Sequence, residues 1–276
     1  MNMESMVDGL AALVPTDSDI HPGADGLMYC NRCYTARQSR IELLGRVKVV
    51  PCLCQCMAEE RDRREKERKQ QEFMAKVMSN RAVGFSDKEL RLCTFGADDG
   101  ADPKLTNAMK AYVEHFPTLR KNGKGLLLYG DVGTGKTFLA ACVVNALIDR
   151  GYPCLMTNFS RLANQIAGLW EGKQEYIDSL SMFALVAIDD LGVERDTEYM
   201  NENVTTIIDS LYRANVPMII TSNYTPKQLT ETKEIRRKRV FDRMLERCHP
   251  IKVNGESRRK DKGRQEFSDM NRLLGL

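Results

Sequence analysis

The chain has 276 residues with a formal net charge of +3, and 42% of its residues are hydrophobic and 29% charged. This composition suits a soluble protein with one sizeable α/β domain and a small additional module. No apolar run approaches the ~20 residues that a membrane span needs. The N-terminus also lacks a basic region followed by an apolar core, which disfavours secretion. We therefore expect a cytoplasmic protein with no membrane partner.

The charge is unevenly distributed along the chain. From Tyr224 to Leu276 the sequence has 15 lysines and arginines against eight acidic residues. A basic C-terminal quarter predicts an anionic partner, which could be a nucleotide, a nucleic acid or an acidic protein surface.

The sequence divides into four predicted segments. Residues 1–26 are rich in turn formers and predict a flexible tail. Residues 27–58 form a cysteine module, 59–94 a helical linker and 95–276 the main domain. In the linker, residues 59–72 contain six acidic and six basic residues, which predicts a solvated helix with pairs such as Glu60–Arg64 and Asp62–Lys66. A nucleic-acid-binding helix is the alternative, but its charges cancel. Ser86 to Glu89 is a candidate capping box for a further short helix.

The cysteine module contains five of the nine cysteines: Cys30, Cys33, Cys52, Cys54 and Cys56. Clustered thiols in a reducing compartment hold metal more often than they form disulfides. Their number and softness suit a tetrahedral structural Zn²⁺, with one thiol to spare, and unliganded thiols are the alternative. Residues 40–50, between the cysteine groups, alternate about a central glycine and predict a hairpin. We expect the other four cysteines to be ordinary buried thiols.

The most specific motif of the chain is G-x-x-x-x-G-K-[ST], which should occur by chance in about one chain in a hundred of this length. Residues 125–129 before it predict a buried strand and residues 138–150 after it predict a helix. Glycines in such a turn let backbone N–H groups face a phosphate at the helix N-terminus. The predicted nucleotide site comprises Gly130, Asp131, Val132, Gly133, Thr134, Gly135, Lys136 and Thr137. Lys136 would reach the β- and γ-phosphates, and Thr137 would bind Mg²⁺.

Two carboxylates follow the apolar run 183–188, which predicts a strand of a parallel sheet. Because ligands bind beyond the carboxyl ends of such strands, both acids should reach the nucleotide. We expect Asp189 to hold Mg²⁺ and Asp190 to orient the attacking water. A further strand, 216–221, precedes Asn223, whose side chain could bond the γ-phosphate or that water. Alternatively, Asn223 is only a turn residue.

The C-terminal quarter contains three more candidate features. Residues 234–247 predict a basic helix that contains Arg243, which could stabilise transition-state charge in a neighbouring subunit or simply lie on a solvated face. Residues 251–253 predict a closing strand. The turn after it is followed by Arg258 and Arg259.

Together these motifs, in their order and spacing over residues 95–260, resemble the AAA+ ATPases of the replicative-helicase loader group (DnaC-like), a branch that includes the IstB transposition ATPases. The resemblance implies an α/β P-loop NTPase fold with a central, mostly parallel sheet flanked by helices. It implies Asn223 as sensor 1, Arg243 as the arginine finger and Arg259 as the sensor 2 arginine, with Arg258 as its alternate. Asp190 stands where many of these proteins have glutamate.

The resemblance also extends to zinc-bearing loaders of phage and bacterial type. It points to Cys30, Cys33, Cys54 and Cys56 as the zinc ligands, with Cys52 as the alternate. Such modules contact the helicase in that group.

The resulting functional hypothesis is an ATPase that uses ATP, Mg²⁺ and Zn²⁺ and loads a DnaB-type helicase hexamer, with single-stranded DNA as a further partner and self-association through the ATP site. An IstB-like accessory ATPase for DNA transposition is the main alternative. A metabolite kinase leaves the cysteine module unexplained, and a regulator that binds ATP without hydrolysing it stays open because of Asp190.

Overall fold

The computed structural model describes residues 19–43, 45–169, 171–192, 198–231 and 235–274. Its contacts divide the chain into two compact units, Met1–Met74 and Ala75–Leu276, and each is described here by itself.

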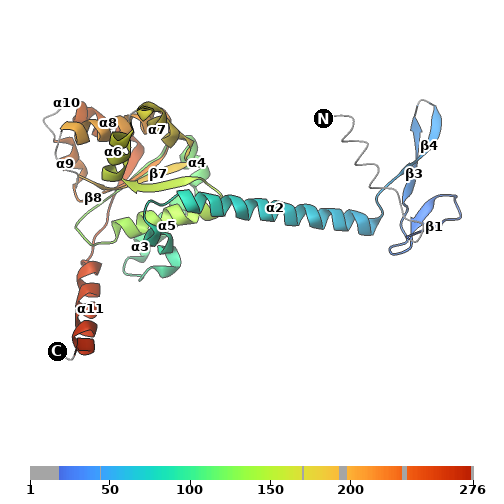
Figure 1. The fold of residues 1–276 in the computed structure, drawn as a ribbon, viewed down its shortest axis with the longest axis horizontal. Coiled ribbons are helices and arrows are strands. Elements are labelled where there is room, and N and C mark those ends of the chain that lie inside the picture. The colour runs from blue at the N-terminus through green and yellow to red at the C-terminus, as the bar shows by residue number, and fades with distance from the viewer. Residues whose placement is uncertain (1–18, 44, 170, 193–197, 232–234, 275–276) are drawn as a thin grey trace. The chain divides into compact units, whose positions relative to one another are not determined.

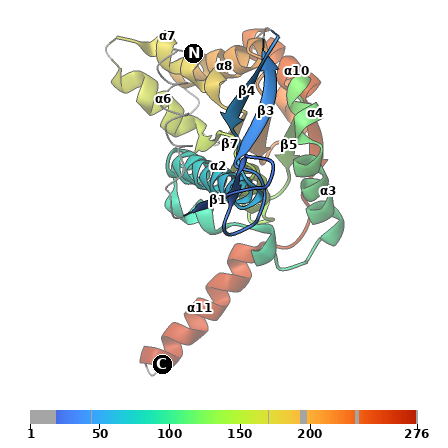
Figure 2. The same ribbon diagram turned by 90° about the vertical axis from the view of Figure 1, so that its right-hand side faces the viewer.

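The first unit is built from two small antiparallel sheets. Strand β1 (Ile20–Pro22) pairs with β2 (Met28–Cys30). Strand β3 (Gln38–Leu43) pairs with β4 (Arg46–Pro51) as the predicted hairpin, and the two strands lie side by side in Figure 2. Strand β1 lies inside the range predicted as a flexible tail, because its short sequence is ordered only through pairing with β2 and gives no periodic signal.

Helix α2 (Gln55–Val83) is continuous and contains the division between the two units. It starts four residues before the predicted linker helix. The ion pair between Arg64 and Glu60 (2.6 Å) forms as expected, whereas Asp62 pairs with its neighbour Arg61 (2.8 Å) instead of Lys66. Exposed pairs of this kind contribute little to stability because water screens the charges, so they support the helix without fixing it.

The second unit contains a five-stranded, wholly parallel sheet in the order β6-β7-β8-β5-β9. The strands are β5 (Gly125–Tyr129), β6 (Cys154–Asn158), β7 (Leu185–Leu191), β8 (Met218–Ser222) and β9 (Cys248–Lys252). The apolar runs that predicted β5, β7 and β8 are buried on both faces, as a parallel sheet requires. The expected α/β fold class is therefore confirmed.

Helices cover both faces of this sheet, as Figure 1 shows. One face packs against α3 (Pro103–Glu114), α4 (Phe116–Lys121) and α5 (Lys136–Asp149). The other packs against α6 (Phe159–Gly168), α7 (Lys173–Ser179), α8 (Glu198–Arg213), α9 (Pro226–Thr230) and α10 (Ile235–Arg247). Alternate side chains of β5 show the division: Leu126 and Leu128 join the first core and Leu127 the second.

The remaining elements are short or terminal. The 3₁₀ helices are η1 (Lys88–Leu92), η2 (Phe95–Ala97) and η3 (Leu180–Met182), and α11 (Arg258–Leu274) follows β9. The cap of η1 is Asp87, whose carboxylate accepts from the Glu89 amide (3.0 Å), and not the predicted Ser86. None of the helices in the described ranges is long and apolar enough to cross a membrane.

Strand β9 begins three residues earlier than predicted. The strand includes Pro250, which has no backbone N–H to donate. Since β9 is an edge strand that pairs only with β5, Pro250 is tolerated opposite Leu127.

Candidate functional site

The phosphate-binding motif forms the turn between β5 and α5, as predicted. Two of its glycines are required by geometry. Gly130 has φ +145°, and a Cβ there would lie 2.3 Å from the carbonyl oxygen of Val253. Gly135 has φ +102° and caps the N-terminus of α5. The turn thus presents the N-terminus of a buried helix, which favours an anion.

Lys136 lies inside this turn. Its side chain is buried, and its Nζ donates to the carbonyl oxygens of Gly130 (2.9 Å) and Asp131 (2.7 Å). The ammonium group is therefore held in the concave side of the loop, where the anionic oxygens of a phosphate would provide stronger, charge-assisted acceptors.

Thr137 and Asp189, the two predicted magnesium ligands, meet at the start of α5. The Thr137 hydroxyl donates to Oδ1 of Asp189 at 3.0 Å. The hydroxyl of Thr221, at the end of β8, donates to the same oxygen at 2.6 Å. A hydroxyl and a carboxylate are oxygen ligands of the kind that Mg²⁺ prefers, so the pair fits this ion. Burial raises the pKa of Asp189, against the effect of the Thr221 hydrogen bond.

Thr221 is a site residue that the sequence did not reveal. Besides its bond to Asp189, its hydroxyl accepts from the backbone N–H of Asp190 at 2.9 Å. Asp190 has φ +59°, in the left-handed region that non-glycine residues seldom adopt. One buried hydroxyl at the end of β8 thus holds both acids of β7 in place, and only the pairing of the two strands brings them together.

A cavity of about 850 Å³ lies over the motif. Seven of the predicted site residues line it together: Val132, Gly133, Gly135, Lys136, Thr137, Asp190 and Asn223. Its volume is in the range of known small-molecule sites. The end of the predicted linker and the first residues of the main domain contribute a wall that was not predicted, from Leu90, Cys93, Ala97 and Asp99. Cys93 is therefore partly exposed at the cavity and not an ordinary buried thiol, unlike Cys142, Cys154 and Cys248.

Arg258 also lines the cavity. Its Nε lies 3.0 Å from Oδ2 of Asp99, and its backbone N–H donates to the carbonyl of Gly133 at 3.0 Å. Arg259 follows in α11, but its side chain lies outside the described residues. The geometry thus supports the alternate, Arg258, as the arginine that faces the nucleotide.

Arg243 is placed on a different surface, on α10. Its guanidinium pairs with the carboxylate of Asp209 on α8 and lies 5.5 Å from the ring centroid of Tyr212. It does not line the cavity of its own chain. A role in hydrolysis would therefore require the site of a neighbouring copy.

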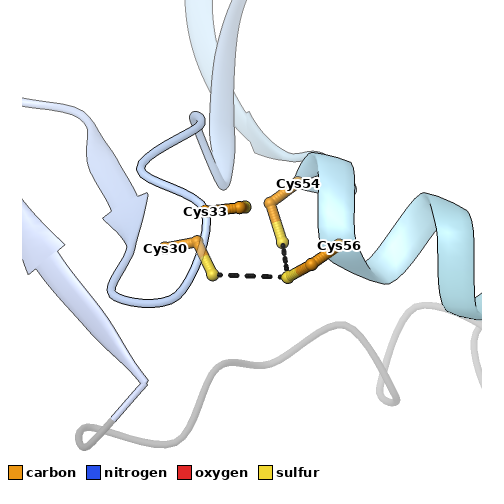
Figure 3. A group of neighbouring side chains, drawn as sticks. All are labelled: Cys30, Cys33, Cys54 and Cys56. Atoms are coloured by element: carbon orange, nitrogen blue, oxygen red, sulfur yellow. Dashed lines mark hydrogen bonds between the residues drawn. The ribbon is translucent and has the colours of Figure 1, made fainter.

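The first unit contains the cysteine cluster. Figure 3 shows four side chains pointing toward one another, two from the end of β2 and the following turn, one from just before α2 and one from its first turn. The sulfurs of Cys30, Cys33, Cys54 and Cys56 all lie within 4.8 Å of one another. The Sγ of Cys56 is 3.6 Å from that of Cys30 and 3.4 Å from that of Cys54.

These distances suit four thiolates around one ion, because tetrahedral Zn–S bonds of ~2.3 Å place the sulfurs about 3.8 Å apart. The fifth thiol, Cys52, instead donates to the carbonyl of Ala36 at 3.4 Å. Within the cluster, a hydrogen bond from the Thr35 hydroxyl lowers the pKa of Cys33 to about 5, whereas the hydrogen bond with Cys54 raises the pKa of Cys56 to about 12. The geometry thus selects the same four cysteines as the resemblance did, and their donor set fits zinc.

Comparison with known proteins shows the family of the chain. The sequence profile of the IstB-like ATP binding proteins matches residues 43–266. The chain belongs to this family. Its predicted membership of the helicase-loader and IstB group is therefore confirmed. The match begins between the two halves of the cysteine cluster, so it includes Cys54 and Cys56 but neither Cys30 nor Cys33.

The named relatives include both a helicase loader and a protein of an insertion sequence. The replicative helicase loader DnaI of Bacillus subtilis is 26% identical over 214 residues, which cover 71% of this chain and 65% of the relative. A protein of a Mycobacterium tuberculosis insertion sequence, named for ATP binding, is 27% identical over 175 residues, 60% of this chain and 67% of that one. The chain thus spans about two thirds of the length of these relatives.

A crystal structure of DnaI supports the fold. It superposes with a TM-score of 0.54 at 23% identity and covers 65% of this chain and 98% of that one. At this identity the likeness concerns the fold alone.

Proposed function

We propose that this protein is an ATP-dependent loader of a replicative hexameric DNA helicase. The observation that carries the proposal is one nucleotide-sized cavity lined by the P-loop lysine, a carboxylate and an asparagine, in a chain that also has a separate cysteine-bearing unit. The cavity supports ATP hydrolysis, and the separate cysteine-bearing unit supports a dedicated extension for binding a partner.

For hydrolysis, each residue takes a role that its position allows. Backbone N–H groups of the P-loop and Lys136 would bind the phosphates, while Thr137 and Asp189 would hold Mg²⁺, which would supply positive charge to offset that of the phosphates. Asp190 orients the attacking water from the cavity wall, and Asn223 contacts the water or the γ-phosphate. Arg243 would act on the nucleotide of an adjacent copy, which makes turnover depend on self-association.

For partner binding, the cysteine unit is too small to fold on burial alone, so Zn²⁺ held by Cys30, Cys33, Cys54 and Cys56 would stabilise it. We infer that this unit contacts the helicase and that the basic C-terminal quarter contacts single-stranded DNA. Binding of DNA through phosphate contacts should weaken steeply as salt rises.

An accessory ATPase for DNA transposition is the second candidate, because the family profile and the M. tuberculosis relative both point to insertion sequences. The ATPase core has the same chemistry in either case. The cysteine unit favours the loader, since it adds a binding module that ATP hydrolysis itself does not require.

The test is capture of the replicative helicase of the same host or phage by the purified full-length protein, with ATP, ADP or no nucleotide. Wild type and Cys52→Ser should capture it, since Cys52 lies outside the four-thiol cluster. Cys30→Ser should not. Capture of the helicase by none of these proteins in any nucleotide state, with capture of a transposase instead, would replace the loader by the transposition ATPase.

A further inference from the structure

Arg37, immediately before β3, is a buried cation beside the cysteine cluster. Only 8% of its surface is exposed. Its backbone is fixed on both sides, because its N–H donates to the carbonyl of Met28 (2.7 Å) and its carbonyl accepts from Cys52 (2.8 Å). The position of the side chain therefore follows from the pairing of the two small sheets and does not depend on a mobile loop.

The guanidinium of Arg37 is directed at sulfur. Its Nη1 donates to Sγ of Cys54 at 3.6 Å and also contacts the sulfur of Met57. Cys54 itself is completely buried. Burying a guanidinium, like burying any other ion, costs several kcal/mol unless an opposite charge or strong acceptors compensate it.

The compensating charge does not come from a carboxylate. Within the part of the chain that the structure describes, no aspartate or glutamate lies within 4.0 Å of the Arg37 guanidinium. Asp25, an acidic residue of the same unit, is engaged by the Tyr29 hydroxyl (2.9 Å) and the Leu27 amide (3.1 Å). The anion that remains is the cluster of thiolates.

We propose that Arg37 is the counter-ion of a tetrathiolate zinc centre formed by Cys30, Cys33, Cys54 and Cys56. Four thiolates around one divalent ion leave an excess of two negative charges in a small, poorly hydrated unit. The guanidinium offsets one of them and donates a hydrogen bond to the buried ligand, Cys54. Arg37 is thus a positioning residue of the metal site, and the proposal rests on the zinc centre of the proposed function.

This assignment has consequences that mere packing would not have. A counter-ion offsets the negative charge of the thiolates, so its loss should weaken zinc retention. It also lowers the electron density on the sulfur, so its loss should make Cys54 react faster with electrophiles. A lysine at the same place keeps the charge, whereas a glutamine keeps a donor and loses the charge. If Arg37 only fills space, lysine and glutamine should behave alike.

The experiment compares full-length wild type, Arg37→Gln, Arg37→Lys and the matched control Arg46→Gln. Arg46 lies at the turn of the exposed hairpin, and Arg46→Gln changes the net charge by the same amount as Arg37→Gln. Zinc affinity is measured by competition with a chromophoric chelator, and zinc loss on thiol modification is followed in time. Arg37→Gln should bind zinc about tenfold or more weakly, as other outer-shell losses do. Arg37→Lys should fall between Arg37→Gln and wild type, and Arg46→Gln should match wild type.

Cobalt substitution provides the folding control. The d–d bands of tetrahedral Co²⁺ should persist in every variant, while the thiolate-to-cobalt charge-transfer band should shift only in Arg37→Gln. Equal zinc affinity and equal thiol reactivity of Arg37→Gln and Arg46→Gln would overturn the role of Arg37 alone. Wild-type protein that binds no zinc would overturn the counter-ion and the zinc centre together, while the ATP-dependent part of the proposed function would stand.

Discussion

At the residue scale, the consecutive residues Asp189 and Asp190 have different surroundings. Asp189 is tied to Thr137 and Thr221 by hydrogen bonds, whereas Asp190 is exposed to the cavity. Asp190 has a positive φ, and it follows Asp189 directly in the chain. In the proposed mechanism Asp189 would hold the metal and Asp190 would orient the attacking water.

Replacing Asp190 should therefore affect chemistry more than binding. We expect Asp190→Asn to lower the steady-state ATPase rate about a hundredfold or more, since a positioned base contributes this much. The affinity of Asp190→Asn for a fluorescent ATP analogue should stay within about threefold of the wild-type value. This change is smaller than the tenfold that corresponds to about 1.4 kcal/mol. Asp269→Asn, on α11, serves as the control. Equal ATPase rates for Asp190→Asn and wild type would remove Asp190 from the mechanism.

Asp189 leads to a prediction about stability and pH. Because burial raises its pKa in the folded protein, ionised Asp189 destabilises the protein free of nucleotide, and this cost appears as pH rises through that pKa. At pH 7, Asp189→Asn should therefore melt at a higher temperature than wild type, and the difference should shrink as the solution is acidified below the raised pKa.

The same variant should lose the extra thermal stabilisation that Mg²⁺ adds to bound ATP, because an amide is a poor ligand for this ion. Thermal melts with ATP, with and without Mg²⁺, measure both effects. A lower melting temperature of the nucleotide-free variant at pH 7, or a preserved Mg²⁺ effect, would contradict the assignment.

At the element scale, Asn145 of α5 connects the end of α2 to the cavity wall. Its buried amide donates to the carbonyls of Leu90 (2.9 Å) and Cys93 (2.8 Å), both of which line the cavity. Its oxygen accepts from Nη1 of Arg81 on α2 (2.8 Å). One side chain thus fixes the 3₁₀ segment that forms one wall of the nucleotide site.

Asn145→Ala should leave the Cys93 carbonyl without this donor and remove one of the two donors to the Leu90 carbonyl, which also accepts from the Cys93 amide (3.2 Å). We expect a loss of about 2 kcal/mol or more in the free energy of unfolding, and weaker ATP binding because the wall loosens. Denaturant melts and nucleotide titrations, with the exposed Asn164→Ala as control, provide the measurement. An ATP affinity unchanged in a destabilised variant would show that the wall does not depend on this residue.

The elements also show what sequence can reveal. Motif order placed Lys136 at the start of a helix and Asp189 at the end of a strand, because chain-local patterns specify both. Thr221, Asn145 and Arg37 have no such pattern: each is one polar residue whose role arises when distant strands or helices meet. Pro250 is a related case, since only the sheet order shows that β9 is an edge strand that can accommodate a proline.

At the scale of the whole molecule, the nucleotide residues all lie in Ala75–Leu276 and the clustered cysteines all lie in Met1–Met74. The two activities should therefore be separable. Removing zinc from the full-length protein with a zinc-selective chelator should abolish capture of the helicase but leave ATP affinity within about twofold, because the cavity residues and the cysteine cluster belong to different compact units. Parallel loss of ATP binding would show that the two units depend on each other.

The measurement that tests the central claim most directly is helicase loading on closed circular single-stranded DNA. A hexameric ring cannot thread onto a closed circle, so loading requires that it be opened. The account predicts that wild-type protein with ATP deposits the replicative helicase on the circle, measured as strand displacement of an annealed oligonucleotide, and that Cys30→Ser and Lys136→Ala do not. Displacement that is the same with and without this protein would contradict the account.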